Sequence, residues 1–93
     1  MTGNSTLHLL NKAPEHPRYQ TCINALSPSD TLVLIENGVL SAAGNRLHPP
    51  CKIYALKADI DARALEAACN NLNTIDYDEL VQLTATHSKI ISW

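Results

Sequence analysis

Thr31-Leu32-Val33-Leu34-Ile35-Glu36-Asn37-Gly38 is the stretch of sequence that decides the fold. Its first five residues are apolar or β-branched and do not alternate with polar residues, which is typical of a strand covered on both faces. Such strands belong to parallel sheets, because the helices that connect parallel strands cover the faces of the sheet. The Asn-Gly pair predicts a turn directly after the strand. We therefore expect a parallel sheet in which residues 31–35 form a buried strand.

Similar short apolar runs lie on both sides of this stretch. They are residues 6–10, residues 52–56 and, more weakly, residues 72–75. Stretches with apolar residues at helical spacing lie between or after these runs, and they are residues 17–26, 39–43, 59–68 and 77–86. We expect residues 88–93 to form a tail. This alternation predicts an α/β fold with a mostly parallel sheet of about four strands flanked by helices.

The expected helices carry residues that suit helix ends. Pro17 suits a first helical position, where its missing N–H costs no hydrogen bond. Gly44 suits the C-cap of the short helix before it. Asp76 is expected to cap the last helix with its side chain.

Length and composition indicate one small domain. Residues 6–93 form this domain in our reading, and residues 1–5 precede it as an extension. Only 17% of the 93 residues are charged, against about 25% in a typical globular domain. The formal net charge is −2, and the charges are scattered, which argues against a dedicated nucleic-acid-binding module.

The longest apolar run is far shorter than the ~20 residues of a membrane span. The first residues lack the pattern of a secretory signal, so we expect a cytoplasmic protein without direct contact to membranes or nucleic acid.

The sequence contains no cofactor-binding fingerprint. Gly3, Gly38 and Gly44 fit neither the Gly-x-Gly-x-x-Gly pattern nor a phosphate-binding P-loop. Asn37-Gly38 follows a strand, where α/β folds bind ligands, but a plain turn explains it as well.

Two loose His/Cys pairs are present, His48 with Cys51 and His16 with Cys22. Neither has the paired clusters of four ligands that a zinc site normally needs, so we expect no metal site.

The three cysteines predict different roles, and an odd number agrees with reduced thiols. Cys69 is expected to be a small buried apolar residue, and Cys51 to pack at the start of a strand. Cys22 lies near His16 and Arg18 in the first helix, so we expect it to be partly exposed near positive charge. Such surroundings lower the pKa of a thiol and make Cys22 the candidate reactive cysteine.

Two aromatic residues complete the candidates. His8, in the middle of the first strand, is expected to be a core histidine with satisfied hydrogen bonds. Trp93 ends an apolar stretch, and two alternatives stay open for it, packing on the protein's own core or anchoring an interface.

Taken in order, a series of short motifs resembles the TusB/DsrH family of sulfur-relay proteins. The motifs are Leu7-His8-Leu9-Leu10-Asn11-Lys12-Ala13-Pro14, Asp30-Thr31-Leu32-Val33-Leu34-Ile35-Glu36-Asn37-Gly38-Val39, Gly44-Asn45-Arg46, Lys52-Ile53-Tyr54-Ala55-Leu56, Asp59-Ile60-Asp61-Ala62-Arg63, Ile75-Asp76-Tyr77, Leu80-Val81-Gln82-Leu83-Thr84 and His87-Ser88-Lys89-Ile90-Ile91-Ser92-Trp93. Each motif is weak alone, but together they are fairly specific.

The resemblance implies a DsrE-like three-layer α/β fold. It also implies assembly with TusC/DsrF-type and TusD/DsrE-type subunits into a heterohexamer. Such a sulfurtransferase complex takes persulfide sulfur from TusA-type carriers and passes it through TusE-type carriers toward 2-thiolation of the tRNA wobble uridine. Its main sulfur-carrying cysteine belongs to the TusD/DsrE-type subunit, so this chain is expected to be an auxiliary, non-catalytic subunit.

Alternatives to this function stay open. DsrH-type members carry a cysteine at the position of Cys22, which makes a persulfide-carrying role conceivable. The chain is then a stand-alone carrier, or a DsrH subunit serving dissimilatory sulfur oxidation. A structural homo-oligomer without relay activity is the third alternative.

The chain departs from the family pattern in two internal places. Ala64 stands where a glycine commonly follows the Ala-Arg pair, and we expect it to continue the helix. The loop between Gly44 and Cys51 is shorter than in typical members.

Overall fold

The fold is an α/β sandwich seen in a computed structural model, which describes residues 5–45, 49–65 and 72–93. Five parallel strands form one sheet in the order β4-β3-β2-β1-β5. The elements in chain order are β1 (Thr6–Leu10), α1 (Pro17–Ala25), β2 (Thr31–Leu34), the 3₁₀ helix η1 (Glu36–Asn45), β3 (Lys52–Leu56), α2 (Lys57–Ala62), β4 (Thr74–Ile75), α3 (Tyr77–Thr86) and β5 (Lys89–Ser92). The expected α/β class is confirmed.

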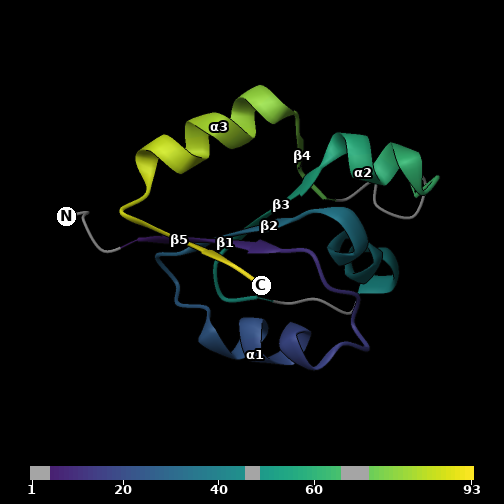
Figure 1. Cartoon of the computed structure of the whole chain (residues 1–93), viewed down its shortest axis with the longest axis horizontal. Helices are drawn as coiled ribbons and strands as arrows, with labels where there is room; N and C mark the ends of the chain where they lie inside the picture. The colour runs from purple at the N-terminus through teal and green to yellow at the C-terminus, as the bar shows by residue number, and fades with distance from the viewer. Residues whose placement is uncertain (1–4, 46–48, 66–71) are drawn as a thin grey trace.

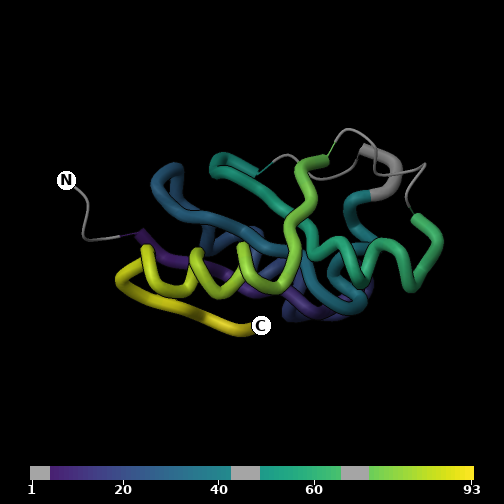
Figure 2. Tube along the Cα trace, turned by 90° about the horizontal axis from the view of Figure 1, so that it is seen from above, coloured from purple at the N-terminus to yellow at the C-terminus, as the bar shows by residue number. Residues whose placement is uncertain are grey.

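Helices cover the two faces of the sheet and make three layers. α1 lies on one face and α3 on the other (Figure 1). Seen from above, α3 runs alongside β5 at one side of the molecule and α2 lies toward the other (Figure 2). Two apolar clusters fill the space between the layers, one including Tyr19 and Cys22 of α1, the other including Leu80 and Leu83 of α3. No helix in the described ranges is long and apolar enough to cross a membrane.

The central strand behaves as its sequence predicts. All four residues of β2 are buried. Because side chains alternate between the faces of a strand, Leu32 and Leu34 join the cluster beneath α1, whereas Val33 joins the cluster beneath α3. The prediction of a strand covered on both faces is confirmed.

The last strand was not expected. Residues 88–93 contain a strand, β5, which pairs in parallel with β1 and places Ile90 level with Leu7. Ser88 anchors its start, because its backbone N–H donates to the carbonyl oxygen of Ser5 at 3.2 Å. A four-residue edge strand shows too little alternation to be told from a tail, and it brings the sheet to five strands.

The segment after β2 is a long 3₁₀ helix rather than the expected short helix over residues 39–43. Gly38 explains part of this geometry, because a Cβ atom there would lie 2.0 Å from the carbonyl oxygen of Leu10. Only a residue without a side chain allows η1 to pass so close to the end of β1. The N–H of Gly38 donates to the carbonyl oxygen of Ile35 at 2.8 Å, which confirms the turn.

α2 is shorter than expected, and Ala64 is the reason. The expectation that Ala64 continues the helix is wrong, because its φ angle is 53°, in the left-handed region. The N–H of Leu65 donates to the carbonyl of Ile60 at 3.1 Å, and that of Ala64 to the carbonyl of Asp61 at 3.1 Å. These two bonds form a Schellman motif, in which glycine is the favoured residue at the left-handed position. Residues 66–68 of the expected helix lie outside the described part of the chain.

Replacing Ala64 by glycine should therefore stabilise the protein. The left-handed conformation costs an L-residue about 1 kcal/mol that glycine avoids, so we expect the free energy of unfolding to rise by about 0.5–1 kcal/mol. Urea unfolding followed by circular dichroism measures this change. The matched control is Ala62→Gly inside α2, which should lower the free energy of unfolding by a similar amount. An Ala64→Gly variant that is less stable than the parent contradicts the argument.

Candidate functional site

A buried polar network links His8 of β1 to Asp30 and to Trp93. His8 of β1 is 2% exposed, and its Nε2 lies 2.9 Å from Oδ2 of Asp30, which is itself 7% exposed. The indole N–H of Trp93 donates to Nδ1 of His8 at 3.1 Å. Because Nδ1 accepts this hydrogen bond, Nε2 carries the ring proton and donates a hydrogen bond to Oδ2 of Asp30. The expectation of a satisfied core histidine is confirmed, whereas its partners could not be read from spacing.

Asp30 receives more than the histidine bond. The N–H of Thr6 donates to Oδ1 at 3.1 Å, and the N–H of Ser27 donates to Oδ2 at 3.0 Å. Burial alone raises the pKa of this carboxyl group, but the hydrogen bonds that it accepts from His8, Ser27 and Thr6 outweigh the effect of burial. The pKa of Asp30 is therefore lowered, and the group remains a carboxylate at neutral pH.

Trp93 is held on the protein's own core. Its ring stacks on His8 with the centroids 6.1 Å apart, and it packs against the cluster beneath α1. The backbone N–H of Trp93 donates to the carbonyl oxygen of Leu9 at 2.9 Å, and Nζ of Lys12 donates to the carbonyl oxygen of Trp93 at 2.6 Å. The first of the two alternatives for Trp93, docking on its own domain, is what the structure shows.

Cys22 does not have the surroundings expected for a reactive thiol. The expectation of partial exposure is wrong, because Cys22 is fully buried on the inner side of α1. Burial, together with the charge of a Cys51 thiolate, raises the pKa of Cys22 to about 12. His16 turns its Nδ1 to the N–H of Arg18 at 3.1 Å and caps α1 instead of serving the thiol. The apolar spacing of Tyr19, Cys22 and Leu26 was the sequence signal for an inward-facing cysteine.

Cys51 is the more accessible of the two described cysteines. It is half-buried, directly precedes β3 and packs against the same apolar cluster as Cys22, as expected from the sequence. Burial is the first cause that raises the pKa of Cys51, and the negative charge of Asp30 is the second. Both thiols are therefore protonated at neutral pH. Cys69 and His48 lie outside the described residues.

Thiol alkylation should follow this difference in burial. We expect iodoacetamide to modify Cys51 before Cys22 in the folded protein, with Cys22 at least about tenfold slower because its sulfur is buried and protonated. Peptide mass spectrometry after timed quenching measures both rates, and the urea-unfolded chain is the control in which the two rates converge. Faster modification of Cys22 in the folded protein contradicts the burial described above.

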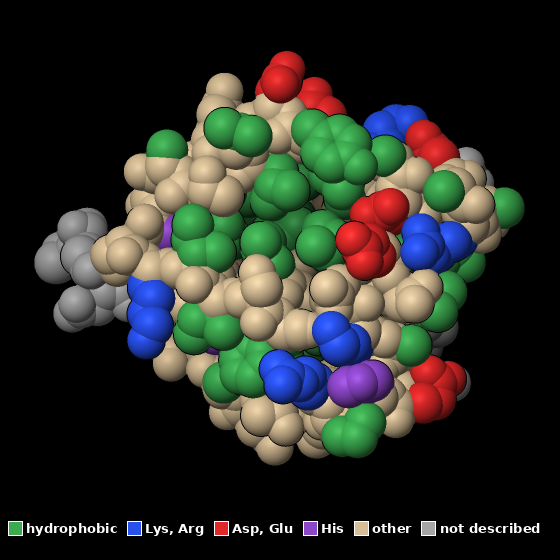
Figure 3. Space-filling model, in the orientation of Figure 1, with side chains coloured by type: hydrophobic (Ala, Val, Ile, Leu, Met, Phe, Trp, Pro, Cys, Tyr) green, Lys and Arg blue, Asp and Glu red, His purple; other side chains and the backbone are tan. Residues whose placement is uncertain are grey.

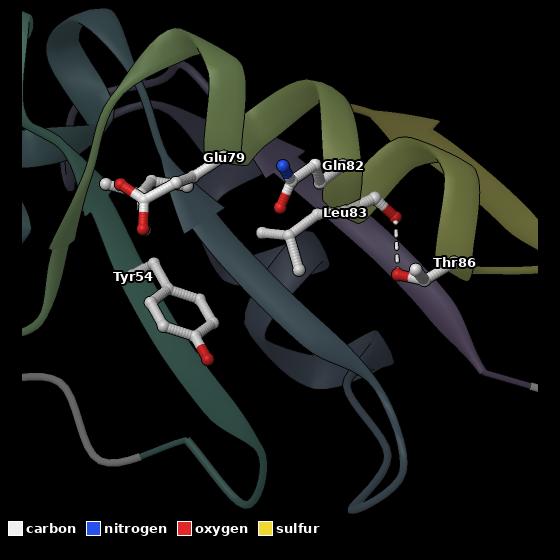
Figure 4. Close-up of a pocket in the computed structure, with 6 residues that line it drawn as sticks. Tyr54, Glu79, Gln82, Leu83 and Thr86 are labelled. Atoms are coloured by element: carbon white, nitrogen blue, oxygen red, sulfur yellow. Dashed lines mark hydrogen bonds between the residues drawn. The ribbon is translucent and has the colours of Figure 1, made fainter.

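A groove opens between α3 and β3. It encloses about 240 Å³ and is lined by Tyr54, Ile75, Glu79, Gln82, Leu83 and Thr86. Figure 4 shows side chains of α3 extending toward Tyr54 of β3, with the Thr86 hydroxyl donating to the Leu83 carbonyl at 3.1 Å. On the opposite side of the molecule, which carries β5, hydrophobic side chains gather around a hollow (Figure 3). Seen from above, α3 lies toward the β1 and β5 side of the sheet and away from β3 (Figure 2).

Several large apolar side chains are exposed on the surface. Tyr77 and Val81 of α3 are 60% and 65% exposed, and Ile90 of β5 is 45% exposed. At about 100° per residue, Tyr77 and Val81 lie on the flank of α3 opposite the groove. Ile90 lies on the same face of the sheet as α3, because it is level with Leu7. Apolar surface of this kind marks sites of protein association.

The carboxyl ends of β2 and β3 carry a network of hydrogen bonds rather than free donors. The N–H of Glu36, whose φ angle is 49°, donates to Oδ2 of Asp59 at 2.7 Å. Arg63 lies 3.6 Å from the Asp59 carboxylate and donates to the side chain of Asn37 at 3.2 Å. Within residues 5–45, 49–65 and 72–93, no three His, Cys, Asp or Glu side chains gather as a metal site requires.

Comparison with known proteins agrees with this fold. The family described as "DsrH like protein" matches residues 12–90. Protein TusB of Pectobacterium parmentieri is 35% identical over an alignment of 94 residues that covers 94% of this chain and 99% of that protein. Protein TusB of Escherichia coli O81 (strain ED1a) is 36% identical with the same coverage.

Two solved structures are also similar. The solution NMR structure of protein Tm0979 from Thermotoga maritima has a TM-score of 0.71 and 32% identity, covering 86% of this chain and 91% of that one. The crystal structure of the ychN protein from E. coli has a TM-score of 0.74 and covers 99% of this chain and 100% of that one. Its identity of 12% supports a common fold alone.

Proposed function

The chain belongs to the DsrH family, and from that premise we propose that it is a TusB/DsrH-type subunit of a sulfur-relay complex. In this proposal it assembles with TusC/DsrF-type and TusD/DsrE-type subunits in a cytoplasmic heterohexamer. The complex passes persulfide sulfur between TusA-type and TusE-type carriers toward 2-thiolation of the tRNA wobble uridine. Residues 6–93 act as one domain.

The burial of Cys22 is the observation that supports an auxiliary role over a carrier role. A persulfide carrier needs an exposed thiolate that attacks a donor and then yields its outer sulfur to an acceptor. Cys22 is fully buried, and its pKa is raised to about 12. A subunit with such a thiol contributes to the complex mainly by its surfaces.

The exposed apolar residues of α3 and β5 provide a surface for subunit contact. Tyr77, Val81 and Ile90 are 60%, 65% and 45% exposed. Aromatic and aliphatic side chains of this kind form the centres of protein interfaces. We propose that a partner subunit covers this flank of α3.

Co-expression with the two partner-type subunits from the same genome tests the proposal. Affinity purification followed by native mass spectrometry should give a complex with two copies of each of the three chains. A chain that purifies alone, as a monomer or homo-oligomer, overturns the proposal. That result leaves the stand-alone carrier and the structural homo-oligomer, and thiol reactivity then decides between them.

A matched pair of variants tests the proposed contact surface. Val81→Asp places a charge on the exposed apolar flank, and we expect it to reduce the yield of the complex at least about tenfold, since an unpaired charge in an interface is costly. Gln82→Asp places the same charge on the groove flank of the same helix, and it should leave the complex intact. Both residues are exposed, so neither change should unfold the subunit. Equal complex yields for the two variants contradict the assignment of the surface.

A further inference from the structure

The indole of Trp93 depends on the protonation state of His8 for its hydrogen bond. The indole N–H donates to Nδ1 of His8 at 3.1 Å. This N–H lies in the plane of the indole, so the positive edge of the ring, and not its π face, points at the imidazole. On its other side the imidazole is fixed, because Nε2 donates to Oδ2 of Asp30 at 2.9 Å. The docked indole therefore requires that Nδ1 of His8 carries no proton.

Protonation of His8 removes the acceptor that the indole uses. A charged imidazole carries an N–H on both ring nitrogens and accepts no hydrogen bond. The N–H of Nδ1 then faces the indole N–H, and two donors meet where a bond of 3.1 Å had been. The bond from Nε2 to Asp30 is kept and becomes an ion pair, which holds the imidazole in place. The group that has to move is therefore the indole.

We propose that His8 and Trp93 form a pH-sensitive latch, in which neutral His8 holds the indole on the core and protonated His8 releases it. Only the side chain is released, because the backbone of Trp93 is held by other groups. Its N–H donates to the carbonyl oxygen of Leu9 at 2.9 Å, and its carbonyl oxygen accepts from Nζ of Lys12 at 2.6 Å. β5 therefore stays in the sheet while the indole turns toward solvent.

The other ionisable groups around the latch are of types that do not titrate in mild acid. Asp30 is a carboxylate there because, despite burial, the hydrogen bonds that it accepts lower its pKa. Burial raises the pKa of Cys22 to about 12 and also raises the pKa of Cys51, so both thiols stay neutral. Tyr19 of α1 and Lys12 complete the set, and side chains of these two types titrate at about pH 10. Histidine is the type that titrates between about pH 5 and about pH 8.

The fluorescence of Trp93 tests the latch on the full chain alone, because the sequence contains one tryptophan. As the pH falls from about 8 to about 5, we expect the emission to move to longer wavelength and the acrylamide quenching constant to rise at least about twofold. Far-ultraviolet circular dichroism should stay constant, since the strands remain paired. A constant quenching constant overturns the proposal. Loss of circular dichroism in the same step also overturns it, because the whole domain then unfolds.

NMR assigns the release to one histidine, which is needed because the sequence contains four. The indole N–H signal and the ring signals of each histidine are followed through the same change of pH in the parent chain. We expect the indole signal to move together with the ring signals of His8. An indole signal that follows His16 or His87 instead overturns the proposal.

A matched pair of variants gives the second test. His8→Gln cannot take up a proton, so its tryptophan fluorescence should not respond between about pH 8 and about pH 5. His16→Ser removes an exposed histidine but keeps a side chain that caps α1, and it should respond like the parent. A folded His8→Gln chain that still releases the indole in acid overturns the proposal, and if glutamine unfolds the chain, the NMR titration of the parent decides. The latch needs no partner subunit, so its failure is distinct from a failure to form the sulfur-relay complex.

Discussion

Replacing Asp30 by alanine should lower the free energy of unfolding by about 2–4 kcal/mol, because a hydrogen bond to a charged group contributes about 1.5–3 kcal/mol. The carboxylate accepts hydrogen bonds from His8, Thr6 and Ser27, and all three donors lose their acceptor in the variant. The imidazole N–H of His8 is buried, and a buried donor without an acceptor costs about 1–3 kcal/mol. The N–H groups of Thr6 and Ser27 are less buried and add smaller amounts. Urea unfolding monitored by circular dichroism measures it.

Asp61→Ala is the control for this variant. Asp61 pairs with Lys57 at 2.7 Å on the surface, where both side chains are more than two-fifths exposed. Exposed pairs contribute about 0–1 kcal/mol, so the control should change stability little. If Asp30→Ala costs no more than Asp61→Ala, the buried network does not stabilise the fold as described.

The cost of Asp30→Ala should depend on pH in a defined direction. The pKa of Asp30 is lowered in the folded protein, so its contribution is complete above the unfolded pKa of about 4. The contribution is lost as the pH falls through the lower pKa of the folded state. The difference in stability between parent and variant should therefore be large at pH 6 and shrink below about pH 4. Urea titrations at the two pH values measure it, and a difference that grows in acid contradicts the sign.

Gly38→Ala should cost about 3 kcal/mol or more, at the upper end of overpacking effects. The added Cβ would lie 2.0 Å from the carbonyl oxygen of Leu10 and 2.9 Å from its carbonyl carbon. Both atoms are backbone, so β1 or η1 must move as a whole. The same carbonyl accepts the N–H of Ile35 at 3.0 Å, and this movement also strains the junction of β1 and β2.

Asn37→Ala is the neighbouring control for the glycine variant. Asn37 is exposed and accepts one hydrogen bond from Arg63 at 3.2 Å, so its loss should cost about 0.5 kcal/mol or less. Thermal unfolding of the two variants compares their losses of stability. The comparison shows whether the loss in Gly38→Ala comes from the close approach of η1 to Leu10 or from any change in the turn. Similar stabilities for the two variants contradict the close approach.

The sequence predicted the elements whose burial is complete or whose ends carry clear signals. β2 is apolar throughout because both of its faces are covered. α3 begins at the capping box of Asp76 and Glu79, where each side chain accepts the other's backbone N–H. The expected start of α1 at Pro17 is confirmed for the same kind of reason.

Other features depend on contacts that no local pattern encodes. The end of α2 depends on the left-handed conformation of Ala64. The sequence does not indicate this end, because alanine prefers to continue a helix. β5 depends on the free edge of β1 rather than on its own alternation. The network of His8, Asp30 and Trp93 joins three distant segments, so the sequence indicated a satisfied histidine but not its partners. The helical spacing of Tyr19 and Leu26 indicates that Cys22 faces inward, whereas the nearby His16 and Arg18 favoured partial exposure.

The pairing of β1 with β5 has a consequence for synthesis on the ribosome. Trp93 lies 85 residues from the His8 side chain that it meets, so this edge of the sheet cannot close until almost the whole domain has emerged. During translation β1 can pair with β2, but its other edge keeps unpaired backbone groups and His8 lacks the cover of Trp93. Contacts between such distant residues slow folding, because a large loop must close before they form. The nascent chain therefore presents an open strand edge until β5 has been synthesised, and during that interval a chaperone or a partner subunit has most to protect.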